Sequence, residues 1–169
     1  RLATLETATI LKQELNRSLT ICDPYAGFGP AIVPLISHDG LVKEIIASDL
    51  NPDAVAILRE NLPIDAKINC CDARDLKSKY SEKVDLLLVN LPHDSLAHLP
   101  ELLPLMAKNH PVVVRCWAII PLDKIEQTEL ELKHIFAKSK IHNLKLEPAR
   151  SYSPNESYTC IEAKITFIN

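Results

Sequence analysis

Apolar runs of strand length alternate with segments of helical period along most of the chain. The strand candidates are residues 19–22, 44–48, 67–70, 84–89, 112–117, 143–146 and 158–167. The helix candidates between them are residues 30–37, 53–61, 95–108 and 122–140. Such alternation predicts an α/β fold in which a mostly parallel sheet is covered by helices on both faces.

The last two strand candidates break this alternation, because only residues 147–157 separate them. A connection without a helix predicts antiparallel pairing, as a hairpin at one edge of the sheet. One helix start is also marked by its chemistry. Asn51 is a good N-cap, Pro52 suits the first helical position, and Asp53 adds a negative charge at the positive end of the helix dipole.

Composition limits what this sheet can belong to. The chain has 169 residues, 47% of them hydrophobic and 24% charged, which predicts one globular domain over residues 1–169 with a continuous core. The five cysteines show no C-x-x-C spacing, so we expect buried, reduced thiols and no metal site. No apolar stretch approaches the length that spans a bilayer, and we expect a cytoplasmic protein without a membrane partner.

The net charge of −3 excludes a basic coat that wraps nucleic acid. Any affinity for nucleic acid must therefore be local. The densest basic group comprises Lys133, Lys138, Lys140, Lys145 and Arg150. Two interpretations stay open for it, a solvated surface of a helix and a strand edge, or a contact surface for RNA.

Two of the three glycines in the chain lie in one loop directly after the first strand candidate. The loop reads Asp23-Pro24-Tyr25-Ala26-Gly27-Phe28-Gly29-Pro30, and Pro30 is expected to begin a helix. Small residues at this point let backbone N–H groups approach a ligand. Ile32 stands where a dinucleotide fingerprint has its third glycine, which disfavours a pyrophosphate and favours a nucleoside.

Acids follow three successive strand candidates. Asp23, Asp49 and Asp72 each stand at a strand end, and we expect them in register. Because an open α/β sheet binds ligands at the carboxyl ends of its strands, these acids should meet in one crevice. There Asp49 could accept both ribose hydroxyls of a nucleoside, and Asp72 could accept from an adenine amino group.

The fourth strand candidate delivers Asn90-Leu91-Pro92-His93 to the same edge. Pro92 fixes the backbone. Asn90 offers an uncharged amide, which can orient a planar acceptor without competing for a methyl group on a sulfonium. A polar cap at the strand end is the alternative interpretation.

These motifs together resemble class I S-adenosylmethionine-dependent methyltransferases. Within them the chain looks most like the catalytic domain of archaeal and eukaryotic tRNA (guanine-N1)-methyltransferases, which modify the guanosine 3′ of the anticodon. The resemblance covers almost the whole chain and rests on the motifs 23–30, 49–52, 71–74 and 90–92, on residues 59–62, and on Arg150-Ser151-Tyr152-Ser153-Pro154.

The resemblance implies a Rossmann-like sheet of seven strands with the last one antiparallel. It also implies S-adenosylmethionine as cofactor, tRNA as partner and no metal. The implied cofactor-binding residues are Asp23, Tyr25, Gly27, Gly29, Asp49, Leu50, Asn51, Asp72, Ala73, Asn90 and Pro92. An N-terminal tRNA-docking domain of the family is missing from these residues, so we expect the chain to be a fragment.

Guanine N1 carries a proton at neutral pH, so its methylation needs a base or a group that stabilises charge on O6. The resemblance implies that Asn90 orients the guanine base and that Arg1 stabilises the charge on O6. Leu5 occupies the position of the family's proposed base, and Glu6 is one position further, which is about 100° around a helix. Glu6, His93 and Asp94 are the candidate bases.

Three functions stay open at this point. The first is methyl transfer to guanine N1 in tRNA. The second is a cofactor-binding module with impaired catalysis, suggested by Leu5. The third is transfer of a methyl or aminocarboxypropyl group to another acceptor, since only 5% of the residues are aromatic and few of them can stack on bases.

Overall fold

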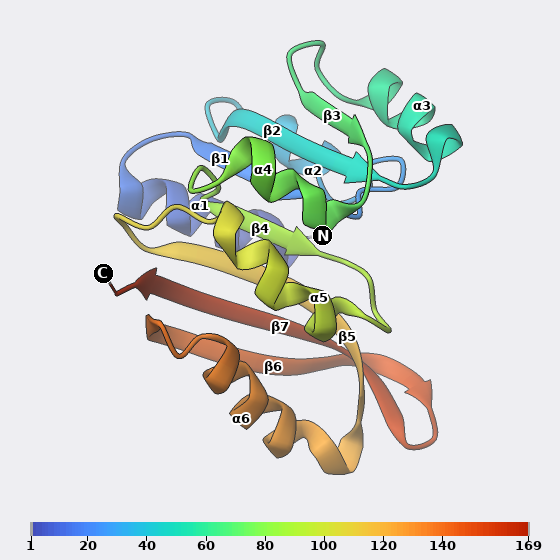
Figure 1. The fold of residues 1–169 in the computed structure, drawn as a ribbon, viewed down its shortest axis with the longest axis vertical. Helices are drawn as coiled ribbons and strands as arrows, with labels where there is room; N and C mark the ends of the chain where they lie inside the picture. Colours follow the sequence, from blue (N-terminus) through green and yellow to red (C-terminus); the bar gives the residue numbers. More distant parts are fainter. Residues whose placement is uncertain (1, 169) are drawn as a thin grey trace.

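The computed structural model describes residues 2–168 and contains one mixed sheet of seven strands (Figure 1). The strands are β1 (Leu19–Asp23), β2 (Val42–Asp49), β3 (Lys67–Cys70), β4 (Leu86–Val89), β5 (Val112–Pro121), β6 (Ser139–Ser153) and β7 (Glu156–Phe167). Their order across the sheet is β3-β2-β1-β4-β5-β7-β6. Only β7 runs against the others, because it pairs antiparallel with both β5 and β6. The predicted fold class and the antiparallel hairpin at one edge are confirmed.

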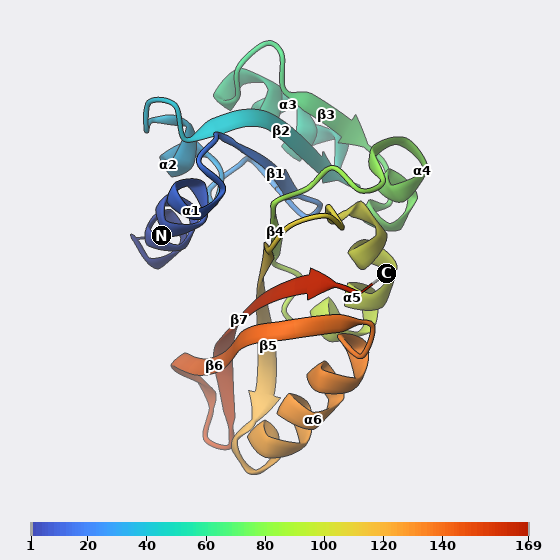
Figure 2. The ribbon, with the colours of Figure 1, turned by 90° about the vertical axis from the view of Figure 1, so that its left-hand side faces the viewer.

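Helices cover both faces of this sheet. They are α1 (Leu2–Leu15), α2 (Val33–Ile36), α3 (Pro52–Asn61), α4 (Lys77–Tyr80), α5 (Ser95–Leu102) and α6 (Ile125–Ile135), with 3₁₀ turns at Ala73–Leu76, Leu103–Leu105 and Leu122–Lys124. Figure 2 shows α1 and α2 on one side of the sheet and α4, α5 and α6 on the other. The two layers bury the central strands completely.

Strand β4 shows how the sequence produces this arrangement. Leu86 and Leu88 face the cluster under α1 and α2, whereas Leu87 and Val89 face the cluster under α5 and α6. All four side chains are fully buried. A strand covered on both faces needs apolar side chains at every position, and each contributes about 1.5–3 kcal/mol through burial.

The helix starts and ends differ from the sequence prediction at several points. Pro30 does not begin a helix: a turn follows Gly29, whose carbonyl accepts from Ile32 and Val33, and α2 begins only at Val33. Pro34 then occupies the first helical turn, where a missing N–H costs nothing. Helix α3 begins as predicted, because the Asn51 side chain accepts from the backbone N–H of Asp53 at 2.9 Å.

Two predicted helices are too long. The helix predicted for residues 95–108 ends at Leu102, since Pro104 stands in the next turn and lacks the N–H that would continue the ladder. The helix predicted for residues 122–140 ends at Ile135, and the chain has already entered β6 at Ser139. Strand β6 is therefore much longer than the predicted 143–146, and the short helices of residues 73–80 were not predicted at all.

Strands β5, β7 and β6 extend well past the end of β4. Val89, the last residue of β4, pairs with Cys116, and β5 continues for five more residues to Pro121. Over that length, about 17 Å, β5 pairs only with β7. We call this three-stranded extension, residues 117–121, 156–160 and 147–153, the hairpin wall. It projects past the carboxyl end of β4, the parallel neighbour of β5 in the sheet (Figure 1).

A buried carboxylate holds the opposite, amino edge of the sheet. Asp85, just before β4, is 1% exposed and accepts two hydrogen bonds of 2.8 Å from Arg17, one of 2.8 Å from the N–H of Thr20 and a contact of 2.7 Å from His110. Burial alone would raise the pKa of Asp85, but these partners outweigh it and lower the pKa below its usual value. The ionised carboxylate therefore joins β1, β4 and the segment before β5.

Replacing Asp85 with Asn should lower the free energy of unfolding by about 1.5–3 kcal/mol at pH 7, because the buried carboxylate gives way to an amide that cannot accept both charge-assisted hydrogen bonds from Arg17. Since the folded-state pKa of Asp85 lies below its unfolded value, its contribution is present above that value, near 3.8, and is lost as the pH falls further. Urea unfolding of both proteins should therefore show a gap that closes toward pH 3. Asp65→Asn, at an exposed acid, is the control, and a gap that is the same at pH 7 and pH 3 would exclude this role.

Candidate functional site at the carboxyl edge of the sheet

The three acids predicted to meet at the carboxyl edge lie at successive strand ends, but they are not in register. Asp23 pairs with Ala47, two positions before Asp49, and Asp49 pairs with Cys70, two positions before Asp72. Each acid therefore lies about 7 Å further along the strand direction than the one before it. The carboxyl edge is therefore stepped. β1 ends lowest along the strand direction, and the loop that follows it lies beside the end of β2.

Hydrogen bonds to Asp49 connect the glycine loop to β2. Asp49 Oδ2 accepts from the N–H of Gly27 at 2.8 Å, and Oδ1 accepts from the N–H of Asn51 at 2.9 Å. Gly27 has φ +54°, and a Cβ at this position would meet no atom within 4 Å. Because that space is open, Gly27 leaves room for a ligand. A Cβ on Gly29 would instead lie 3.0 Å from Leu58, so Gly29 serves packing.

Asp23 is 2% exposed at the base of this loop. Burial raises its pKa to about 7, and the charge of Asp49 adds to the rise, although a hydrogen bond from the N–H of Tyr25 at 3.3 Å opposes it. The group therefore titrates near neutral pH. The structure thus brings together the predicted site residues Asp23, Tyr25, Gly27 and Asp49.

Asp72 differs from its predicted environment, because Arg74 already binds it. The Arg74 backbone N–H and Nε donate to Asp72 Oδ1, both at 2.9 Å, and the other end of the guanidinium donates to Oδ2 at 2.6 Å. These bonds hold the pKa of Asp72 well below its usual range. Oδ2 keeps one lone pair for a ligand. Ala73, next in the chain, is buried.

Side-chain contacts also fix the loop from the other face. The Tyr25 hydroxyl lies 2.7 Å from His98 Nδ1 on α5, and burial raises the pKa of Tyr25 above its usual value. Leu50, by contrast, is 70% exposed beside Asp49. The loop is therefore anchored to α5 through Tyr25 and to α3 through Asn61, whose side chain donates to the Phe28 carbonyl at 2.8 Å.

The Asn90-Leu91-Pro92 segment follows β4 and is held at three points. The N–H of Leu91 donates to Ser95 Oγ at 3.0 Å, and the Pro92 carbonyl accepts from the N–H of Ile119 at 3.0 Å. The Asn90 side chain accepts from the Tyr158 hydroxyl at 2.8 Å. The last two contacts come from the hairpin wall, so the wall and the segment form one rigid corner.

Sequence reasoning missed the side chains that the hairpin wall contributes. The Arg150 guanidinium lies 4.7 Å from the centre of the Tyr158 ring, and Tyr152 meets the ring of His93 edge to face at 5.9 Å. Arg150 was noted as a member of a basic group and, with Tyr152, as part of a resemblance, but neither was expected beside the Asn90 segment. Nothing in the sequence near Tyr158 indicates that its hydroxyl reaches a residue 68 positions away.

The three candidate bases lie in two different places. Glu6 is exposed on α1 and lines a groove of about 480 Å³ with Arg115, Lys145 and other residues of β5, β6 and β7. His93 and Asp94 are exposed and directly follow the Asn90 segment. Leu5 packs against the cluster under α1. Arg1 lies outside the described residues.

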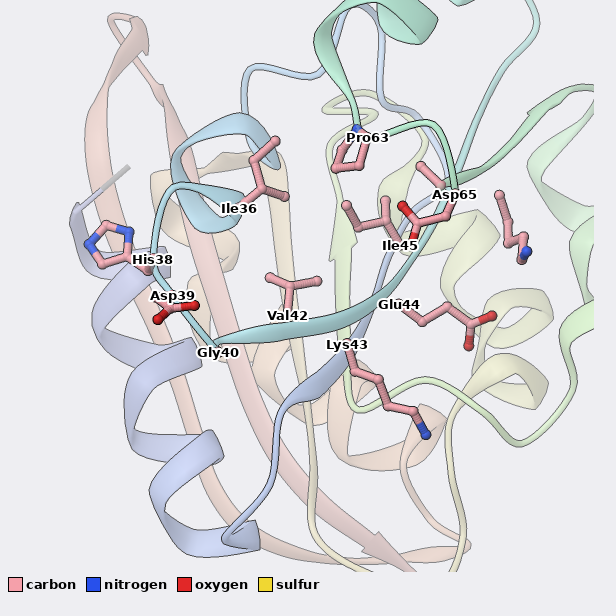
Figure 3. Close-up of a pocket in the computed structure, with 12 residues that line it drawn as sticks. Ile36, His38, Asp39, Gly40, Val42, Lys43, Glu44, Ile45, Pro63 and Asp65 are labelled. Atoms are coloured by element: carbon pink, nitrogen blue, oxygen red, sulfur yellow. The ribbon is translucent and has the colours of Figure 1, made fainter.

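A larger cavity, of about 600 Å³, lies at the opposite edge of the sheet (Figure 3). It is lined by the loop before β2 and by the start of β2 and β3, including His38, Asp39 and Lys43. Its polar side chains are exposed or half-buried, and none of the predicted site residues reaches it. Volume alone is therefore a poor guide to the site here.

Three further features bear on the predicted chemistry. Residues 2–168 contain no group of three His, Cys, Asp or Glu side chains placed to hold a metal ion. Within the same residues, no helix combines the length and the apolar character needed to cross a membrane. The five cysteines are free thiols, but Cys70 is exposed and Cys71 half-buried, contrary to the expectation of burial, because both lie at the open end of β3.

Comparison with known proteins shows similarity to tRNA methyltransferases. No family model matches the chain. The tRNA (guanine(37)-N(1))-methyltransferase of Entamoeba histolytica is 25% identical over 166 residues, which are 93% of this chain and 41% of that protein. The chain thus spans less than half the length of this relative.

Two solved structures share the fold. M. jannaschii TYW2 in complex with AdoMet superposes with a TM-score of 0.80 and 18% identity over 98% of this chain and 76% of that one. The M. jannaschii tRNA m1G37 methyltransferase does so with a TM-score of 0.70 and 22% identity over 96% of this chain and 49% of that one. The resemblance inferred from the motifs is confirmed: the chain has the fold of the class I methyltransferases and is similar along nearly its whole length to a tRNA (guanine-N1)-methyltransferase.

Proposed function

We propose that the chain is an S-adenosylmethionine-dependent methyltransferase that transfers the methyl group to N1 of the guanosine next to the tRNA anticodon. The observation that carries the proposal is the arrangement at the carboxyl edge of the sheet. Gly27 and Asp49 are joined there by a hydrogen bond at the ends of β1 and β2, and Asn90 follows the end of β4. A relative that matches 93% of the chain is named for this reaction, which supports the same proposal.

The residues of the stepped edge fit a nucleoside cofactor. Asp49 uses one lone pair of each oxygen on backbone N–H groups, so each oxygen can still accept a ribose hydroxyl. Open space above Gly27 admits the cofactor close to the backbone. Asp72 Oδ2 can accept from the adenine amino group, and the exposed side chain of Leu50 can cover one face of the ring.

When bound, S-adenosylmethionine supplies an electrophilic methyl group on a sulfonium. The protein must then hold the acceptor nitrogen in line with that methyl group and remove its proton. Asn90 would orient the base through its amide. Glu6, His93 and Asp94 remain the candidates for the proton acceptor, and Arg1 with Asn90 the candidates for stabilising charge on O6.

The transferred group has an alternative. One structural neighbour with a TM-score of 0.80 is TYW2 rather than a guanine-N1 enzyme, and transfer of an aminocarboxypropyl group uses the same cofactor. The impaired module also stays open, because Leu5 offers no proton acceptor where the family has its proposed base. Two expectations remain predictions: that the chain works together with an N-terminal tRNA-docking domain, and that the protein is cytoplasmic.

One prediction of the proposed function concerns binding of the cofactor. Asp49→Asn should weaken S-adenosylmethionine binding by about tenfold or more in isothermal titration calorimetry, because the neutral amide cannot accept both ribose hydroxyls as a carboxylate does. Asp53→Asn, four residues further at the start of α3, removes an equal charge from an exposed site and should bind like the wild type. Equal affinities for all three proteins would contradict the assignment of Asp49.

The second prediction concerns the acceptor. With labelled S-adenosylmethionine, the chain should transfer the methyl label to a tRNA transcript, and changing the guanosine 3′ of the anticodon to adenosine should abolish transfer. Mass spectrometry of the digested nucleosides identifies the group: an aminocarboxypropyl adduct would establish the alternative reaction. Tight cofactor binding without any transfer, even when a tRNA-docking domain is fused to the N-terminus, would indicate the impaired module.

Transfer that survives reversal of charge at Lys138 and Lys140 would favour a small acceptor over tRNA. Both residues are exposed at the start of the hairpin, so neither variant should disturb the core.

A further inference from the structure

The contact between Tyr158 and Asn90 constrains which hydrogen bonds the amide can offer. A side-chain amide has one carbonyl oxygen that accepts and one NH₂ group that donates. In this structure the Tyr158 hydroxyl donates to Asn90 Oδ1 at 2.8 Å. For residues 2–168 we find no partner of Asn90 Nδ2, and Asn90 is exposed at the end of β4. The NH₂ group is therefore the part of the amide that remains free to donate to the molecule that receives the methyl group.

Neighbouring residues hold Tyr158 in this position. Arg150 is its direct cross-strand partner in the hairpin, and the register shift between Pro148 and Arg150 allows the guanidinium to lie over the ring at 4.7 Å. Such a cation–π contact stabilises the ring orientation. Tyr158 also pairs with Ile119 on its other side, the residue whose N–H binds the Pro92 carbonyl.

The hydroxyl also keeps its proton. Burial raises the pKa of Tyr158, and the opposing effect of Arg150 is smaller. A neutral phenol has a proton to donate, and the carbonyl oxygen is the end of a side-chain amide that accepts. The hydroxyl of Tyr158 therefore has its proton, and the 2.8 Å contact makes Asn90 Oδ1 the acceptor of that proton.

We propose that Tyr158 is a positioning residue that fixes the Asn90 amide with its NH₂ group toward the acceptor. It thereby selects a base that has a carbonyl oxygen, rather than an amino group, at the ring position facing this NH₂ group. A guanine-type base presents such an oxygen, whereas adenine would place a donor against a donor. The inference deepens the proposed function and rests on it for the identity of the acceptor, but the polarity of the amide can be measured without any acceptor.

The polarity is measured by NMR on the ¹⁵N-labelled chain, with the Asn90 side-chain signals assigned through Asn90→Asp. In the wild type, both Nδ2 protons should exchange with water as fast as those of a free amide, and Tyr158→Phe should shift this pair of signals. Tyr80→Phe is the control, because it removes a hydroxyl that accepts a 3.4 Å hydrogen bond from Asn69 on β3. This substitution should leave the Asn90 signals unchanged. Unchanged signals in Tyr158→Phe, or one protected Nδ2 proton in the wild type, would overturn the proposal.

The positioning role is measured by kinetics with the tRNA transcript. Tyr158→Phe should lower kcat about tenfold and reduce the preference for guanosine over adenosine, with KM for tRNA and the cofactor affinity within twofold of wild type. Tyr80→Phe should match the wild type. An unchanged kcat in Tyr158→Phe would overturn the role, whereas an inactive wild type would count against the proposed function and leave the NMR result to decide the polarity.

Discussion

The hydrogen bond between the Gly27 N–H and the Asp49 carboxylate is the contact on which the candidate site depends. It joins the loop after β1 to the end of β2, which are separated by 22 residues in sequence. The left-handed conformation of Gly27 turns its N–H toward the acid while leaving open space where a side chain would stand. The same carboxylate binds the N–H of Asn51, so the start of α3 is fixed by the same group.

A second constraint comes from the sheet topology. Inserting β7 antiparallel between β5 and β6 lets these three strands pair with one another far beyond the end of β4. A parallel strand there would need a crossover helix, whereas a hairpin needs only a short turn. The result is a wall next to the Asn90 segment, fixed to it through the N–H of Ile119 and the hydroxyl of Tyr158.

Local patterns predicted the parts of the fold that local chemistry determines. Largely apolar runs marked β1 and β4, and the Asn51-Pro52 pair marked the start of α3. Strand β6 was underestimated because most of it is exposed and carries polar side chains such as Lys145, Glu147 and Arg150, so it lacks the apolar run that marks a buried strand. Its length is set by pairing with β7, which is a long-range effect.

The same division applies to the site. The acids and glycines near β1 and β2 were predicted because each follows a strand directly, whereas the Arg74 contact that occupies Asp72 depends on a side-chain conformation that no pattern specifies. The contact of Tyr158 with Asn90 depends on the register of three strands. Sequence reasoning therefore named residues expected at the cofactor, and Asn90 at the acceptor, but missed the contact of Tyr158 with Asn90.

This difference explains why the fold comparisons do not determine the reaction. Residues around Gly27 and Asp49 would bind the nucleoside part of the cofactor, which is the same whichever group is transferred. On our proposal the acceptor would instead be recognised beside Asn90 and the hairpin wall, where the amide NH₂ group is left to donate because Tyr158 occupies the carbonyl. A group fixed in this way distinguishes acceptors by their hydrogen-bonding polarity, since pairing a donor with a donor leaves both unsatisfied and costs about 1–3 kcal/mol. On this proposal, specificity for the acceptor would depend on contacts between distant strands rather than on the motifs that identify the fold.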